Sequence, residues 1–537
     1  MQFVSFLGLV VLLLIAWAIS EHRSKVRART VIWGLGLQFL FAVIILRGDY
    51  WSFVGMALLA GLIAVYILSR EGGGIRWGQV AASIVLAGAV AAILARFVPE
   101  VMGWLVLATV AVLLANGRWS FAPKVQPLLS TFFLAAGVGY LVASGNNGQT
   151  IFASLSSSVS DFLNLSDYGA RFLFGNLANP AFYGADGGWK GFGFLFAFKV
   201  LPTIVFFGGF MAVLYYLGIV QKVVEAMAHF MRWTLGTSGA ETLSCSANIF
   251  VGQTEAPLLI KPFLQEMTKS ELLTIMVGGF ATIAGGVLAG YIAFGVPAGH
   301  LIAASVMSAP AALVIGKIIY PETEHSKTAG DAGLPDIDSG SNLIEAASGG
   351  ITDGLKLSVN VGAMLLGFIA LIAVVDVILN YMDSLIDGRL LDGAIVTYSS
   401  GGLSPVTQEF AGFFPGSLQT FFGTLLRPLA FVMGVPWADA GQVGNLLGIK
   451  LSLNEFVAYG QLGNYIAEEA ISERAKIIST YALCGFANFS SIGIQIGGIS
   501  AIAPSRRSDL ARVGLKAMIG GAIASWITAT LAGILIT

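Results

Sequence analysis

Two glutamates of this sequence lie inside strongly apolar stretches, where a charged side chain needs a specific reason to be present. Glu255 lies in NIFVGQTEAPLLIKPF, residues 248–263, directly after a glutamine and a threonine. Glu455 lies in GNLLGIKLSLNEFVAYGQLGNY, residues 444–465, directly after an asparagine. Carboxylates accept strong hydrogen bonds from hydroxyl and N–H donors. Both stretches therefore predict a buried polar site.

The composition places the chain in a lipid bilayer. Of its 537 residues, 56% are hydrophobic and 11% are charged, whereas soluble domains carry about 25% charged residues. Several apolar runs reach the roughly 20 residues that a helix needs to cross a bilayer. Open sheets are excluded there, because lipid offers their edges no hydrogen-bond partners. We therefore expect an all-α polytopic membrane protein, with spans before residue 145 at about 3–20, 30–47, 51–69, 78–97, 101–116 and 126–144.

Basic residues set the expected orientation. Arg and Lys cluster in the segments 21–29 and 505–512, and cytoplasmic loops carry an excess of these residues. With the spans given above, four further basic residues fall on the same side: Arg70, Arg76, Arg118 and Lys124. We therefore expect both termini outside, in a multi-pass protein of the inner (plasma) membrane.

The stretch around Glu255 is too short and too polar for an ordinary span. Its apolar flanks have the length of half a helix, and Pro257 and Pro262 follow the polar residues. Non-helical backbone at membrane depth survives only where protein or a water-filled cavity surrounds it. We expect a re-entrant hairpin at 238–262, with two half-helices meeting at a tip. The alternative is a surface loop between two ordinary spans.

The second half of the chain repeats this pattern. The segment 444–465 again has a glutamate within an apolar run of half-span length, and residues 479–504 follow as a helix interrupted by polar residues. In the first half, the glycine-interrupted segment 276–293 follows the first hairpin. Broken segments at corresponding positions of two halves point to a transporter site near the membrane midplane. Counting spans gives the two hairpins opposite orientations, so inverted repeats are expected.

Several motifs in this order resemble the concentrative nucleoside transporter family. They are GQTEAPL, ATIAGG, NEFVAY and CGFANFSSIGIQIGG, and the resemblance covers roughly 145–537 closely. It implies a homotrimer in which each protomer moves a nucleoside inward with a cation, by an elevator-like motion of the two-hairpin part against a scaffold. It implies no cofactor and no nucleic-acid partner.

The resemblance also implies which residues form the site. The substrate positions are Gln253, Thr254, Glu255, Val287, Glu455, Phe486, Asn488 and Ser491. The sodium positions are Asn248, Val251, Thr282 and Ile283. From spacing alone, Val287 and Phe486 are explained equally well as residues that line the pocket and as residues that only pack helices together. The presence of the sodium set favours sodium over protons, and a titrating Glu255 is the alternative.

The family pattern also divides the chain. Compact bacterial members pass almost directly from the second span to an interfacial helix, so 48–144 reads as inserted extra spans. The expected parts are 1–47 (two scaffold spans), 48–144 (insertion), 145–235 (interfacial helices and a scaffold span), 236–320 (first hairpin and following helices), 321–350 (cytoplasmic loop and interfacial helix), 351–385 (scaffold span) and 386–537 (second hairpin, broken helix and last span).

A membrane enzyme and a channel are the more remote alternatives. The sequence has no D-D-x-x-D or H-E-x-x-H motif, and its four histidines are scattered. A channel would need a pore ring without hairpins. We therefore expect a transporter and not an enzyme.

Overall fold

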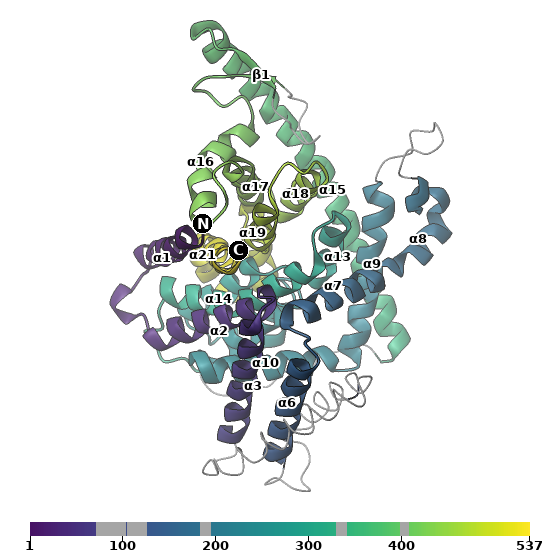
Figure 1. Cartoon of the computed structure of the whole chain (residues 1–537), viewed down its shortest axis with the longest axis vertical. Coiled ribbons are helices and arrows are strands. Elements are labelled where there is room, and N and C mark those ends of the chain that lie inside the picture. The colour runs from purple at the N-terminus through teal and green to yellow at the C-terminus, as the bar shows by residue number, and fades with distance from the viewer. Residues whose placement is uncertain (71–103, 105–125, 183–194, 329–340, 398–407, 537) are drawn as a thin grey trace. The chain divides into compact units, whose positions relative to one another are not determined.

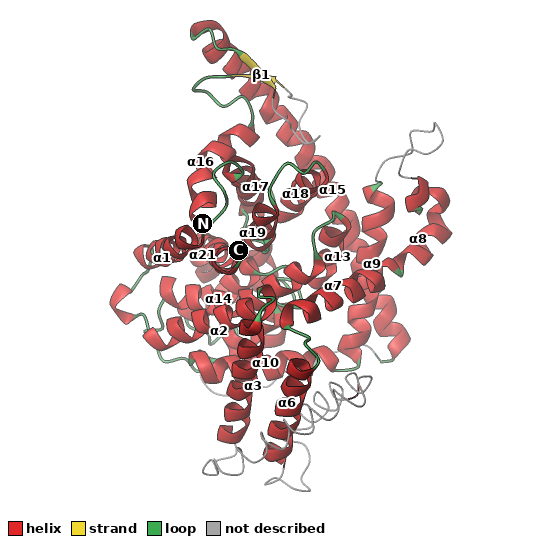
Figure 2. Cartoon of the chain, in the orientation of Figure 1, coloured by secondary structure: helices red, strands yellow, loops and turns green. Residues whose placement is uncertain are grey.

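The protein is almost entirely α-helical, as the composition predicts (Figure 2). The computed structural model describes residues 1–70, 104, 126–182, 195–328, 341–397 and 408–536. The strands within this part form one antiparallel pair, β1 (Ile395–Thr397) with β2 (Gln408–Phe410). The chain divides into a unit of residues 39–155 and a larger unit of residues 1–38 and 156–537.

The unit of residues 39–155 is a small helical assembly. Helix α3 (Tyr50–Arg70) packs against α6 (Gln126–Ala143). The Ser52 hydroxyl donates to the carbonyl oxygen of Ile44 at 2.8 Å and accepts the Gly148 N–H at 2.8 Å. It therefore ties α3 to the end of α2 (Ala28–Leu46) and the start of α7 (Gly148–Asn164).

The expected N-terminal spans are found as helices wherever the structure describes them. Those at 3–20, 30–47, 51–69 and 126–144 correspond to α1 (Gln2–Ala18), α2, α3 and α6. The two expected at 78–97 and 101–116 lie outside the described residues. The part expected to begin with an interfacial helix, 145–235, starts with the helix α7.

The larger unit holds two kinds of long apolar helix. In α14 (Ala298–Ile319) and α21 (Arg507–Leu535), 83% and 78% of the most apolar stretch is buried. In α9 (Phe196–Tyr216) and the apolar end of α15 (Leu343–Asp383), only 22% and 17% is buried. Helices α14 and α21 pack against each other, whereas α9 packs along α15 (Figure 1). The first pair forms a protein core, and the second pair leaves apolar side chains for lipid or for another copy.

Close contact between α9 and α15 depends on glycine. A Cβ atom on Gly354 would lie 3.0 Å from the Val205 Cα atom, and one on Gly208 would lie 2.7 Å from the Gly350 carbonyl oxygen. Small residues at such positions let membrane helices approach closely. Helix α15 runs without interruption across the boundary at residue 350 that the sequence suggested.

Each half of the larger unit contains the predicted order of short helices. The first set is α11 (Gly239–Ala247), a 3₁₀ turn (Ala256–Ile260), α12 (Lys269–Ala281) and α13 (Gly285–Ala293). The second set is α17 (Ala440–Ser452), α18 (Glu455–Ala467), α19 (Glu473–Leu483) and α20 (Phe489–Ile502). The longest of these helices reaches only about 20 Å at 1.5 Å per residue, which is less than a bilayer core. The repeat is therefore present in the fold, and its inverted placement in a membrane stays a prediction.

Backbone geometry explains both helix breaks. The first break begins at Thr282, which has extended backbone angles, and ends at Ala284. The second contains Gly485, with φ of +125°, where a Cβ atom would lie 2.5 Å from the Phe280 carbonyl oxygen. Only glycine combines this φ with so close a neighbour.

The remaining described elements are three helices and several short turns. The helices are α8 (Ser166–Phe174), α10 (Ile219–Leu235) and α16 (Leu418–Val432). The 3₁₀ turns are Arg23–Lys25, Gly175–Ala178, Pro180–Phe182 and Pro504–Arg506, and a π-helical turn covers Ser384–Leu390. The sequence analysis did not predict the β1–β2 pair. Two buried carboxylates hold β2 and the residues after it in place. Asp383 accepts a hydrogen bond from the Phe410 N–H at 2.8 Å, and Asp387 accepts hydrogen bonds from the N–H groups of Phe413 and Phe414.

Two capping boxes start the helices of the first set. In α11, Ser238 and Glu241 exchange side-chain and backbone hydrogen bonds, and Thr268 and Glu271 do the same in α12. Each box satisfies two N–H groups that a helix start otherwise leaves unpaired. Both glutamates are fully buried. Glu271 accepts hydrogen bonds from the Ser326 and Thr328 hydroxyls, whereas Glu241 needs a compensating positive charge.

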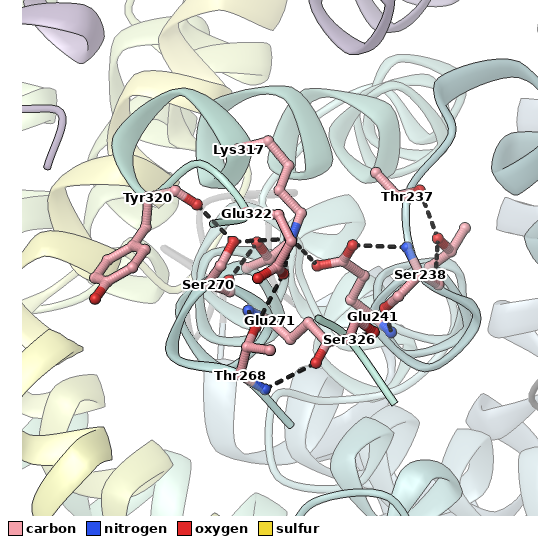
Figure 3. A network of polar contacts seen from close by, with 12 residues as sticks. Thr237, Ser238, Glu241, Thr268, Ser270, Glu271, Lys317, Tyr320, Glu322 and Ser326 are labelled. Atoms are coloured by element: carbon pink, nitrogen blue, oxygen red, sulfur yellow. Dashed lines mark hydrogen bonds and ion pairs between the residues drawn. The ribbon is translucent and has the colours of Figure 1, made fainter. Parts of the chain in front are cut away.

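Lys317 supplies that charge from the end of α14 (Figure 3). Its ammonium lies 2.8 Å from Glu241 and 3.2 Å from Glu322, and it donates to the Ser270 hydroxyl at 2.9 Å. Lys317 is 9% exposed. One buried cation therefore fastens the open end of the first hairpin to α12 and α14.

We predict that Lys317→Met strongly destabilises the protein, because it leaves Glu241 charged and buried without its partner. Breaking a buried ion pair from one side costs about 3–5 kcal/mol. The thermal unfolding midpoint in detergent measures the effect. Lys327→Met is the matched control, since the ammonium of Lys327 lies 3.7 Å from Glu266 and both side chains are exposed. A Lys317→Met midpoint equal to that of the control would contradict this role.

Candidate functional site

Glu455 is the buried carboxylate of the site. It is the first residue of α18 and is 4% exposed. The Tyr291 hydroxyl donates to one of its oxygens at 3.0 Å, and the Asn488 amide donates to the other at 3.3 Å. The helix start adds a favourable positive potential. Helices α13, α18 and α20 therefore meet at one negative charge.

Sequence reasoning missed Tyr291. A signal was available, because Tyr291 follows the predicted lining residue Val287 by four positions in α13. Residues at i and i+4 share one face of a helix. Val287 itself is buried, and Phe486 lies half-buried in the second break.

Asn488 links the carboxylate to the start of α20. As the N-cap residue, its side-chain oxygen accepts the Ser491 N–H at 2.9 Å and the Ser490 hydroxyl at 2.8 Å. The amide nitrogen is then left to face Glu455. Capping thus fixes which end of the Asn488 side chain meets the carboxylate.

The tip of the first hairpin reaches the same helix. Gln253 is 8% exposed, and its amide nitrogen donates to the Ser491 hydroxyl at 3.3 Å. Thr254 is half-buried and faces α20, since a Cβ atom on Gly498 would lie 2.8 Å from its methyl group. The structure therefore joins four predicted residues into one hydrogen-bonded chain: Gln253, Ser491, Asn488 and Glu455.

Glu255 differs from the expectation of two buried carboxylates. Its side chain is exposed in the single chain and accepts the Gly252 N–H at 2.5 Å. The reason is local, because Glu255 directly precedes the 3₁₀ turn at Ala256–Ile260 and folds back over the hairpin turn. In the single chain Glu455 is buried and Glu255 is exposed.

The four predicted ion ligands lie at the first hairpin tip and the neighbouring helix break. All are buried. The Gly285 N–H donates to the Phe250 carbonyl oxygen at 3.2 Å, which joins the two segments. Thr282 ends α12, and its hydroxyl donates to the Gly278 carbonyl oxygen at 2.9 Å.

The side-chain oxygen of Asn248, one of these four residues, receives no hydrogen bond from the described residues. Asn248 is 1% exposed, and its amide nitrogen donates to the Ser244 carbonyl oxygen at 3.1 Å. Within the described residues, neither the Asn248 side-chain oxygen nor the Ser244 hydroxyl has a hydrogen-bond partner. Hard cations bind oxygen ligands of this kind. Sequence reasoning did not single out Ser244.

Three family models match successive parts of the chain. "Na+ dependent nucleoside transporter N-terminus" matches residues 7–56 and 102–177, "Nucleoside recognition" matches 197–298, and "Na+ dependent nucleoside transporter C-terminus" matches 300–533. The chain belongs to the Na+ dependent nucleoside transporter family. The interruption at 57–101 lies inside the segment expected to be inserted.

Relatives and solved structures agree with this family. An uncharacterized transporter of Haemophilus influenzae is 42% identical, over 81% of this chain and 97% of that protein. Sodium/nucleoside cotransporter 1 of Mus musculus is 43% identical over 74% of this chain, which spans 58% of the mouse protein's length. The structure of CNTnw in an inward-facing substrate-bound state is 32% identical, covers 100% of this chain and 98% of CNTnw, and has a TM-score of 0.71.

These matches settle the broad class of the protein. The named relatives are transporters and not enzymes. Together with six described helices long and apolar enough to cross a bilayer, they make this transporter a multi-pass membrane protein of a sodium-dependent nucleoside family.

We predict that Glu455→Gln lowers nucleoside affinity sharply. The change keeps the side-chain shape but replaces one acceptor oxygen with an N–H₂ group, which then faces Tyr291 or Asn488. Losing a hydrogen bond to a charged group costs about 1.5–3 kcal/mol, roughly ten- to a hundredfold in affinity. Binding of labelled uridine measures it. Glu473→Gln is the control, because Glu473 is an exposed partner of Lys476. Equal affinities in the two variants would rule out Glu455 as a ligand contact.

Proposed function

We propose that the protein is a secondary active symporter that imports nucleosides, such as uridine, with sodium. The observation that carries this proposal is the chain from Gln253 through Ser491 and Asn488 to Glu455. It places a carboxylate at one end and an amide at the other. A nucleoside offers ribose hydroxyls, which are donors, and a base edge with several polar atoms. The Glu455 carboxylate suits the ribose hydroxyls, and the Gln253 amide suits the polar edge of the base.

Glu455 would bind the ribose hydroxyls. A carboxylate is acceptor-only when ionised and prefers O–H donors. Its existing partners, Tyr291 and Asn488, leave acceptor capacity because a carboxylate offers about four lone-pair sites. Sites built for a hydroxyl discriminate strongly against ligands that lack it, so deoxyribose should bind more weakly. Gln253, Thr254 and Glu255 would contact the base, with Val287 and Phe486 supplying apolar walls.

Sodium would bind at Asn248, Val251, Thr282 and Ile283. The side-chain oxygen of Asn248, which has no hydrogen-bond partner in the described part of the chain, and the hydroxyl of Thr282 belong to two segments that a backbone hydrogen bond holds together. Asn248 and Gln253 lie five residues apart in the same hairpin. Ordering the tip around an ion would therefore preorganise the nucleoside contacts, and the two affinities must be linked reciprocally.

The transport cycle would be an elevator-like movement in a homotrimer of the inner membrane, with both termini outside. The exposed α9 and α15 suit a scaffold that faces lipid or other protomers. The two helix sets around the buried α14 and α21 suit a moving part with its own core. Solved structures of CNTnw include inward-facing, outward-facing and intermediate states, with TM-scores of 0.70 to 0.72 to this chain.

Uptake by proteoliposomes tests the proposal. We expect an inward sodium gradient to drive accumulation of labelled uridine at fixed pH, with trans-stimulation by unlabelled uridine inside. A channel would give no trans-stimulation, and an enzyme would change the compound. Accumulation that follows a proton gradient and ignores sodium would instead support proton coupling, with Glu255 as the titrating group.

We predict that Thr282→Ala raises the sodium concentration needed for half-maximal uptake by about fivefold, the equivalent of one neutral oxygen contact of about 1 kcal/mol. Uridine affinity should approach the wild-type value as sodium is raised. Thr282→Ser keeps the hydroxyl and should behave nearly normally. An unchanged sodium dependence in Thr282→Ala would remove Thr282 from the ion site.

A further inference from the structure

Gln495 is a buried glutamine that the proposed mechanism has not used. It lies on α20, one turn after Ser491, and is 0% exposed. Its amide nitrogen donates to the Gln253 side-chain oxygen at 3.0 Å and to the Met276 backbone carbonyl oxygen at 3.2 Å. Gln495 therefore connects α20, α12 and the tip of the first hairpin.

The packing around this amide leaves no room for a side chain at Gly279 of α12. A Cβ atom on Gly279 would lie 2.6 Å from the Gln495 amide nitrogen and 2.9 Å from the Gln253 Cβ atom. Contacts this short force a neighbour to move, so Gly279 is what lets the two glutamines meet against α12. Three separate segments thus hold one pair of amides in place.

The Met276 carbonyl fixes which way the Gln495 amide points. A backbone carbonyl can only accept hydrogen bonds, so the group facing it must be the amide nitrogen. The reverse orientation would set two oxygens against each other. Within the described residues the Gln495 side-chain oxygen has no partner, so both hydrogen bonds of this amide come from its nitrogen, and turning the amide round would lose both.

The fixed Gln495 in turn fixes Gln253. Since an N–H₂ group faces Gln253, the atom that meets it must be the Gln253 oxygen, and this oxygen is then turned toward Gln495. The Gln253 nitrogen carries two hydrogens, and one hydrogen bond from it, to the Ser491 hydroxyl, is present in the described part of the chain. Its second hydrogen, and the hydroxyl hydrogen of Ser491, are left for a ligand.

We propose that Gln495 is a positioning residue that makes Gln253 an obligatory hydrogen-bond donor, so that the site selects bases by an acceptor such as a ring carbonyl oxygen. This inference rests on the proposed function and deepens it. An unconstrained glutamine could donate or accept with either end of its amide. The site would instead be polarised, with a donor at the base end and the Glu455 acceptor at the ribose end.

The test compares uridine with two analogues that each lack one base carbonyl, the pyrimidin-2-one and pyrimidin-4-one ribonucleosides. In the wild-type protein, removing the carbonyl that meets Gln253 leaves a buried N–H unpaired and should lower affinity about tenfold. In Gln495→Met the Gln253 amide can turn to suit the ligand, so this penalty should shrink to about twofold or less. Isothermal titration in saturating sodium measures all three affinities.

Gln38→Met is the matched control for replacing a buried glutamine of an apolar helix. Gln38 is 0% exposed on α2 and donates to the Gly34 carbonyl oxygen of its own helix. This variant should keep the tenfold penalty. A Gln495→Met protein that keeps the full penalty, or that loses affinity equally for all three nucleosides, would overturn the positioning role.

Gln253→Glu tests the polarity itself and does not depend on the folding of the Gln495 variant. One carboxylate oxygen can still accept from Gln495, but the ligand-facing end becomes an acceptor. Uridine affinity should fall more than tenfold with an unchanged thermal midpoint, and retained affinity would overturn the inference. Failure of the wild-type protein to bind any of the three nucleosides would instead refute the proposed function.

Discussion

The burial of Glu455 is the constraint on which the rest of the site depends. A carboxylate in an apolar interior is tolerated only when strong donors surround it, and here the donors come from Tyr291 and Asn488. Neither donor is near Glu455 in sequence. Helices α13, α18 and α20 must therefore converge, and each must begin or end near the same point.

The helix breaks meet this requirement. A continuous helix satisfies its own backbone and presents no polar groups at its middle. Breaking α12–α13 at Thr282 and α19–α20 at Gly485 creates helix ends in the interior. One end carries Asn488 as its cap, and the other carries the predicted ion ligands. The same device thus places a polar side chain beside Glu455 at one break and the proposed ion ligands at or beside the other.

A second polar network lies at the open end of that hairpin. Lys317 pairs with Glu241 and Glu322 and donates to the Ser270 hydroxyl, so the helix starts of α11 and α12 are anchored to α14. Lys317 anchors only the α11 end of this segment. The position of its turn therefore depends on what the turn contacts, which includes Gln495 and the proposed ion. Two hydrogen bonds of the Gln495 amide nitrogen link the Met276 backbone carbonyl to the Gln253 side chain at this tip.

The sequence by itself determined the class of the protein and the order of its elements. Composition required helices, since only helices satisfy their own backbone in lipid within one segment. Polar residues and glycines within half-span runs predicted both helix breaks, which the structure contains. The motifs around Gln253, Glu455 and Asn488 predicted a site, and the structure joins these residues by hydrogen bonds.

Only the tertiary structure decided which polar groups are satisfied by which partners. Spacing could not reveal that Tyr291 and Gln495 face the site, because their partners lie 164 and 242 residues away. It also gave Glu255 and Glu455 the same expected burial, although the first side chain is exposed in the single chain and the second lies between three helices. Periodicity reports the face of a helix on which a residue lies. Burial and hydrogen bonding depend on what packs against that face, and this is set by contacts between segments far apart in the chain.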